Sequence, residues 1–104
     1  MRLGEGRTRE AAKAPRRPAV VVSNDLFNTY VLVVVVVPLT SKVDRVYPTE
    51  VRIEPEGSGL EHPSKDQVHL VRHVSKGRIL KSLGKLEGAV LKELDDLLRE
   101  LFGL

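Results

Sequence analysis

The feature that most constrains the fold of this chain is an almost unbroken run of valines at residues 31–37. Valine is branched at Cβ, which restricts χ1 and favours the pleated surface of a strand over a helix. Because apolar side chains point to both faces of such a strand, the run predicts a central strand that is covered on both sides. Pro38 has no N–H to donate, so it is predicted to end the pairing of this strand.

Shorter segments of strand-like pattern surround this run. They combine β-branched residues, or apolar and polar residues in alternation, with turn-forming residues between them. These segments are residues 19–23, 49–54, 67–71 and 81–86. Five strands in so short a chain predict a mainly β fold, a small barrel closed by the helix described next.

The last part of the chain predicts that helix. Residues 88–102 carry valines and leucines on one stripe at helical spacing, and Gly103 follows where a helix-ending glycine is common. Residues 1–16 contain glycine, proline and few apolar side chains, and are predicted to be a basic, flexible N-terminal segment. Residues 17–104 are then a single barrel domain. The helical stripe is long for so small a core, which indicates that part of it meets another subunit.

Charge is unevenly distributed over the chain, whose formal net charge is +3. Residues 1–17 hold six basic and two acidic side chains, and residues 72–85 hold five basic side chains and no acidic one. Residues 87–100 are acidic, with five acidic side chains against two basic ones. Two basic clusters suit a polyanionic partner. A solvated surface explains the same charges about equally well.

Several kinds of site and location are excluded or disfavoured by composition. The chain has no cysteine, which excludes disulfides, thiolate metal sites and cysteine nucleophiles. The histidines at 62, 69 and 73 are not spaced as ligands on one helix, so neither a metal site nor a cofactor is predicted. The longest apolar run, residues 30–39, is too short to span a membrane, and no apolar stretch follows the basic start as in a secretory signal. A cytoplasmic protein without membrane contact is therefore expected.

Five motifs in order are similar to those of one known family. Residues 17–25 read R-P-A-V-V-V-S-N-D, residues 36–41 V-V-P-L-T-S, residues 48–51 P-T-E-V, residues 66–68 D-Q-V and residues 83–86 L-G-K-L. Together they extend over most of the chain, and the first two are quite specific in combination. In this respect the sequence resembles the MazF/PemK family of toxin endoribonucleases of type II toxin–antitoxin systems.

The resemblance implies a fold and a function. The fold is a small SH3-like barrel of the CcdB/PemK type with a C-terminal helix, which forms a symmetric homodimer. The function is sequence-specific cleavage of single-stranded RNA, mostly mRNA, by attack of the 2′-OH, with no metal ion or other cofactor. A cognate antitoxin with an acidic tail is the implied protein partner.

The resemblance also assigns roles to individual residues. Arg17 matches the family's catalytic arginine, whose guanidinium can hold two phosphate oxygens at once. Thr40 matches the active-site threonine, whose hydroxyl can donate to a phosphate oxygen. Ser41, Glu10 and His69 are further candidates for catalysis or RNA contact. Four other side chains are expected to bind RNA: Lys13, Arg16, Lys42 and Gln67.

The chain departs from the family at its N-terminus. Residues 1–6 lead almost directly into the basic segment, so the family's usual first strand is predicted to be largely absent. Many members place a glutamate five residues before the catalytic arginine, whereas this chain has Ala12 there and Glu10 lies seven residues before Arg17. The alternative function is therefore a barrel that binds RNA or an antitoxin but cleaves weakly or not at all.

Overall fold

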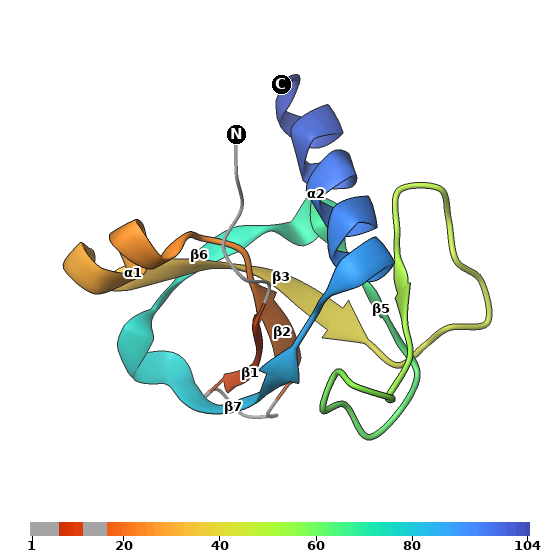
Figure 1. Ribbon diagram of the computed structural model, residues 1–104, viewed down its shortest axis with the longest axis horizontal. Coiled ribbons are helices and arrows are strands. Elements are labelled where there is room, and N and C mark those ends of the chain that lie inside the picture. The colour runs from red at the N-terminus through yellow and green to blue at the C-terminus, as the bar shows by residue number, and fades with distance from the viewer. Residues whose placement is uncertain (1–6, 12–16) are drawn as a thin grey trace.

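A strongly curled antiparallel sheet is the main element of the fold (Figure 1). The computed structural model describes the backbone of residues 7–11 and the whole of residues 17–104. Within this described part, seven strands lie in the order β4-β5-β3-β2-β1-β7, and β6 also pairs with β3. The strands are β1 (Arg7–Ala11), β2 (Pro18–Val21), β3 (Val33–Thr40), β4 (Arg52–Ile53), β5 (Ser64–Asp66), β6 (Arg72–Ser75) and β7 (Ile79–Lys85). The helices are α1 (Asp25–Tyr30), α2 (Gly88–Phe102) and two single 3₁₀ turns, Val68–Leu70 and Lys76–Arg78.

The central strand β3 is covered on both faces, as its two-faced valine run predicts. Val37 and Leu39 belong to a core cluster with Leu94 and Leu98 of α2. Val34 and Val36 belong to a second cluster on the opposite face, with residues of β2 and β6. Because strands twist, the sheet can curl, and the curl lets β3 bury both of its faces in a chain of 104 residues.

Pro38 does not end β3, contrary to the prediction from its missing N–H. The strand continues through it, and Pro38 pairs in register with Ala19 of β2. On its other side β3 changes partner at this point, from β6 at residues 33–36 to β5 at residues 39–40. The carbonyl of Pro38 accepts a hydrogen bond from the N–H of Gln67 (2.9 Å), between the two partners. The proline is therefore tolerated where the ladder has a gap.

The C-terminal helix confirms its predicted span and stripe. Leu94 and Leu98 are fully buried against the sheet. Gly103 adopts the left-handed conformation (φ 72°) that ends the helix. No helix in the described part of the chain is long and apolar enough to cross a membrane.

The N-terminal segment contains a strand where a flexible segment was predicted. β1 pairs with β2 on one side and with β7 on the other, so it joins these two strands within the sheet. The prediction that the first strand is largely absent is therefore wrong for residues 7–11. Residues 1–6 and 12–16 lie outside the described residues.

One other local prediction differs from the structure. Residues 67–71 were predicted to form a strand, but Val68–Leu70 is a 3₁₀ turn that packs against α2. The short helix α1 begins after Asn24, whose side chain caps it by accepting a hydrogen bond from the N–H of Phe27 (3.1 Å).

Candidate active site

A pocket of about 570 Å³ opens where several strands end, and we call it the strand-end pocket. Its walls come from the start of β2, the end of β3, the loop between β4 and β5, and β7. Its charged and polar lining residues are Arg17, Thr40, Ser41, Lys42, Glu61, His62, Ser64 and Lys81. Three cations beside three hydroxyl groups suit the oxygens of a phosphate.

The pairing of β2 with β3 brings Arg17 and Thr40 together. The register pairs Ala19 with Pro38 in antiparallel strands. Continued by two residues, it places Arg17 opposite Thr40, at the rim of the sheet. Residues 23 positions apart in sequence therefore line the same pocket.

Thr40 is half-buried at the end of β3, with its hydroxyl oxygen turned toward the chain that follows. This oxygen accepts a hydrogen bond from the N–H of Lys42 (3.3 Å). The hydroxyl proton is then left to donate to a ligand, while Lys42 is held in the wall of the pocket.

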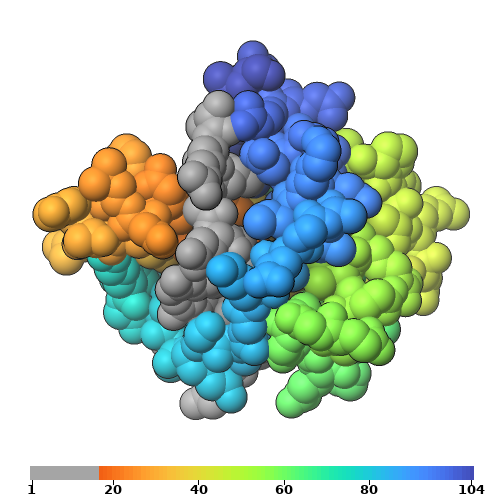
Figure 2. Space-filling model, in the orientation of Figure 1, coloured from red at the N-terminus to blue at the C-terminus, as the bar shows by residue number. Residues whose placement is uncertain are grey.

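The loop between β4 and β5 supplies Glu61 and His62 and is fixed against β7 (Figure 2). A Cβ at Gly59 would overlap the carbonyl of Leu83, and a Cβ at Gly84 would overlap the carbonyl of Ser58. Gly59 also has φ +81°, a conformation that favours glycine. The two backbones touch only because neither residue has a side chain.

A buried cluster fixes the loop between β3 and β4, which follows Ser41 and Lys42. The ammonium of Lys65 donates to the carbonyl of Arg45 (2.7 Å) and to the carboxylate of Glu50 (2.9 Å). The N–H of Tyr47 donates to the same Glu50 oxygen (2.9 Å). Burial alone would raise the pKa of Glu50, but the hydrogen bonds from Tyr47 and Lys65 outweigh it and lower that pKa.

Asp66 is a second buried acid, and it lies outside the lining of the strand-end pocket. One carboxylate oxygen accepts from the N–H of Val51 (3.1 Å), and the other has no hydrogen-bond partner among the described residues. Burial raises the pKa of Asp66 to about 7, and the charges of Glu50 and Glu93 act in the same direction. Asp66 therefore keeps its proton up to a higher pH than an ordinary aspartic acid does.

The structure brings together some of the predicted site residues and separates others. Arg17, Thr40, Ser41 and Lys42 all line the strand-end pocket. His69, exposed on the 3₁₀ turn, and Gln67 just before it are not among the lining residues. The structure describes the backbone of Glu10 but not its side chain, and Lys13 and Arg16 lie outside the described residues.

The sequence did not single out three of the polar lining residues for catalysis or RNA binding, and these lie outside the basic stretches: Glu61, His62 and Ser64. The only sequence signal for Glu61 and His62 is their turn-rich loop with two glycines, which does not indicate that the loop contacts β7. Among the described residues, no group of three or more His, Cys, Asp or Glu side chains is arranged to hold a metal ion.

Comparison with known proteins gives one family and one fold. A family model described as "PemK-like, MazF-like toxin of type II toxin-antitoxin system" matches residues 1–102. Endoribonuclease MazF9 of Mycobacterium tuberculosis (strain ATCC 25618 / H37Rv) is 37% identical over 89 residues, which cover 81% of this chain and 75% of that protein.

Solved structures agree on the fold. An endoribonuclease from Mycobacterial species, in complex with its cognate antitoxin, superposes with a TM-score of 0.83 at 24% identity and covers 97% of this chain and 95% of its own. MazF in a MazE–MazF structure from Deinococcus radiodurans gives 0.82 at 24% identity, with coverage of 97% and 95%. The predicted mainly β barrel with a C-terminal helix is confirmed.

Proposed function

The chain belongs to the PemK-like, MazF-like toxins of type II toxin–antitoxin systems, and we propose that it is a sequence-specific endoribonuclease that cleaves single-stranded RNA, mostly mRNA. The name of the Mycobacterium tuberculosis relative supports this activity. The observation that carries the proposal is that Arg17 and Thr40 line the same cationic pocket, at neighbouring ends of β2 and β3.

RNA supplies its own nucleophile in this reaction. The 2′ oxygen forms a bond to phosphorus and gives its proton to a base, while the bond from phosphorus to the 5′ oxygen breaks and that oxygen takes up a proton. The products are a 2′,3′-cyclic phosphate and a 5′-hydroxyl. Neither a metal ion nor an activated water is required.

Arg17 and Thr40 act on the phosphate in this scheme. The guanidinium of Arg17 holds two phosphate oxygens and stabilises the negative charge that develops on them. The Thr40 hydroxyl donates to one of these oxygens, with Ser41 beside it. Lys42 and Lys81 attract the neighbouring phosphates of the strand and align it.

The alternative of a binding module that does not cut rested on a missing first strand. Since β1 occupies the position between β2 and β7, that reason no longer applies. The test is to incubate the protein with mixed single-stranded RNA in EDTA and to analyse the ends. Cyclic phosphate and 5′-hydroxyl ends, lost when the cleaved nucleotide is 2′-deoxy, support the proposal; tight binding without cleavage supports the alternative.

We further propose that the protein is a homodimer. An apolar groove of about 360 Å³ lies between α1 and the end of α2. Its lining residues are Val22, Ser23, Asn24, Phe27, Val31, Val33, Val35, Val71, Leu98 and Phe102. Beside it Tyr30 and Leu32 are 80% and 84% exposed, which is unusual for large apolar side chains and suits contact with a second copy.

The proposed regulator is an antitoxin with an acidic tail. A negatively charged, extended segment would pair with Arg17, Lys42 and Lys81 and so exclude RNA from the strand-end pocket. The mycobacterial endoribonuclease of similar fold was solved with its cognate antitoxin. We place the protein in the cytoplasm, where its mRNA substrate is translated.

A further inference from the structure

Glu61 is the single carboxylate among the described residues that line the strand-end pocket. We propose that Glu61 reads a nucleobase bound in this pocket, by accepting a hydrogen bond from the exocyclic amino group of that base. This inference rests on the proposed endoribonuclease function and names the substrate more narrowly: single-stranded RNA with adenine, cytosine or guanine, and not uracil, at one position next to the cut.

A carboxylate is out of place in a pocket that only binds phosphate. Arg17, Lys42 and Lys81 attract the RNA backbone, whereas Glu61 repels it. Glu61 is also exposed, and its side chain has no ion-pair or hydrogen-bond partner within residues 17–104. It therefore neither neutralises a described cation nor supports the wall of the pocket, and its acceptor oxygens are left for a ligand.

The backbone that carries Glu61 is fixed on both sides. On one side, the contact of Gly59 with the Leu83 carbonyl joins the loop to β7. The buried hydroxyl of Ser58 strengthens this side by donating to the carbonyl of Glu54 (2.7 Å). On the other side, the hydroxyl of Ser64 donates to the carbonyl of His62 (3.0 Å). The backbone of Glu61 is therefore held in place, which limits the positions that its carboxylate can reach and favours discrimination between ligands.

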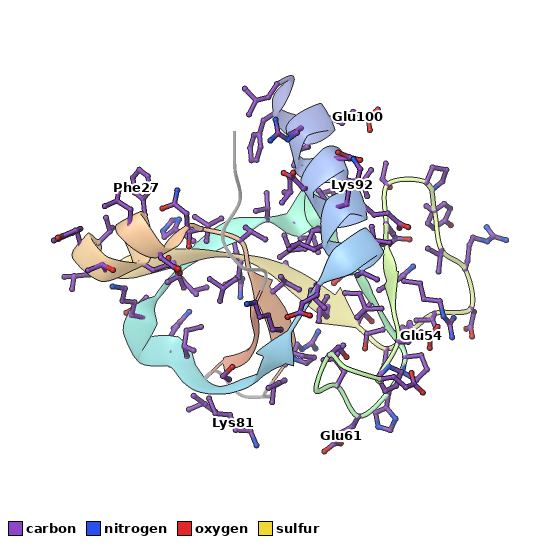
Figure 3. All side chains as sticks on the ribbon, in the orientation of Figure 1. Phe27, Glu54, Glu61, Lys81, Lys92 and Glu100 are labelled. Carbon is purple, nitrogen blue, oxygen red and sulfur yellow. The ribbon has the colours of Figure 1, made fainter. Side chains whose placement is uncertain are left out.

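Glu61 and Lys81 line the pocket from two segments that are far apart in sequence (Figure 3). Both lie at the same end of the molecule, Glu61 on the loop between β4 and β5 and Lys81 on β7. Because Glu61 lines the same pocket as Arg17 and Lys81, a strand of RNA whose phosphate is bound by these two cations can place an adjacent, unstacked base near Glu61. Single-stranded RNA exposes the Watson–Crick edges of its bases to such contacts.

The chemistry of a carboxylate selects among the four bases. An ionised carboxylate only accepts hydrogen bonds. Adenine, cytosine and guanine each offer an exocyclic amino group, while uracil offers one ring N–H flanked by two carbonyl oxygens that repel the carboxylate. Phosphate contacts cannot make this distinction, because they are the same for every base.

The experiment deletes the amino group and the carboxylate separately. The cut site is first mapped, and each flanking base is then replaced by its analogue without the amino group: purine riboside for adenosine, inosine for guanosine, 2-pyrimidinone riboside for cytidine. At one position we expect wild-type cleavage to fall about 10-fold or more, as for loss of one specific base contact. Glu61→Ala should lose a similar factor on the natural RNA and should no longer distinguish it from the analogue.

Two further variants serve as controls. Glu56→Ala removes an equal charge from the same loop at an exposed position that does not line the strand-end pocket. It should distinguish natural RNA from the amino-deleted analogue as well as the wild type does. Glu61→Gln keeps one acceptor oxygen and should retain part of this discrimination. Thermal unfolding of each variant checks the fold.

Several results would overturn the inference. One is an equal loss by Glu61→Ala on natural and amino-deleted RNA, which indicates a structural or general-base role. Another is discrimination in Glu61→Ala as strong as in the wild type, and a third is a preference for uracil at both flanking positions. If the wild type cleaves no RNA, the proposed function fails; the same comparison is then made as the Kd of 2′-O-methyl RNA, so the two failures remain separate.

Discussion

The strand-end pocket and the apolar groove are built on opposite ends of the same strand. β3 contributes Thr40 to the pocket at its end, and Val33 and Val35 to the groove nearer its beginning. Polar side chains at the end of a strand escape the core while their backbone stays rigid, so they can be directed at a ligand. Apolar side chains along the strand can only be buried, by the sheet itself or by another molecule. The comparison suggests that chemistry belongs to one surface and assembly to the other.

The strongest test of this division is Arg17→Ala. Removal of a cation that stabilises developing phosphate charge should lower the cleavage rate about 100-fold or more. Because Arg17 is exposed, its loss should leave the fold and the dimer intact. The measurement is the single-turnover cleavage rate, with circular dichroism and sedimentation on the same sample.

Arg52→Ala is the matched control for Arg17→Ala. Arg52 is exposed, pairs with Glu54 and does not line the strand-end pocket. A cleavage rate near that of the wild type is expected. Arg17→Ala with wild-type turnover would refute the assignment of the site.

The reverse test is Phe102→Asp in the apolar groove. A charge in the middle of a dimer contact should weaken association by about 30-fold, equivalent to about 2 kcal/mol. Phe102 is 58% exposed at the end of α2, so the monomer should still fold. Sedimentation equilibrium over a range of concentrations gives the dimer dissociation constant.

Leu80→Asp provides the comparison for that variant. Leu80 is also an exposed large apolar residue, but it lies on β7 and not in the groove. Leu80→Asp should therefore leave the dimer dissociation constant unchanged. A wild-type chain that sediments as a monomer at all accessible concentrations would contradict the dimer.

The parts of the fold that follow from local pattern were predictable. The valine run of β3 and the leucine stripe of α2 each determine an element and its buried face by periodicity alone. The proximity of Arg17 and Thr40 is different, because it depends on the register of β2 on β3. Only the family resemblance suggested it in advance.

Polar strands were missed because their burial depends on distant partners. Ser64–Asp66 is entirely buried, although no residue in it is apolar. Lys65 is buried because Glu50 and the carbonyl of Arg45 receive its ammonium, and Asp66 because the N–H of Val51 reaches its carboxylate. The position of Glu61 in the pocket also depends on a distant partner. The loop that carries it is held against β7 by the contact of Gly59 with Gly84.

Asp66 sharpens the comparison because it lies in neither surface. With its pKa raised to about 7 by burial, the folded protein binds a proton that the unfolded chain releases near pH 4. The free energy of unfolding should therefore fall as the pH rises between about 4 and 7, by at most about 1.4 kcal/mol per pH unit. Glu50, with its lowered pKa, acts in the opposite sense only below about pH 4.5.

Urea unfolding of the wild type and Asp66→Asn across this pH range measures the effect. The asparagine variant has no proton to lose at this position. Its free energy of unfolding, measured relative to that of the wild type, should therefore increase as the pH rises. Parallel curves for the two proteins would show that Asp66 is ionised at neutral pH in the folded state. Because other titrating groups are common to both proteins, they cancel in the difference.

The smallest expected effect distinguishes two of the three lysines in the basic stretch 72–85, Lys76 and Lys81. Lys81 lines the strand-end pocket, whereas Lys76 starts a 3₁₀ turn outside it and its N–H donates to the carbonyl of Leu32. Each phosphate neutralised on a single strand contributes about −0.7 to the slope of log K against log salt concentration. With three cations in the pocket, the slope for a non-cleavable RNA should be about −2.

Lys81→Gln should reduce the magnitude of this slope by less than one unit and lower affinity about equally for all sequences, since phosphate contacts carry no base information. Lys76→Gln should change neither quantity. An equal effect of both substitutions would mean that RNA follows the basic stretch as a whole, and the pocket would then not be the main site of phosphate binding.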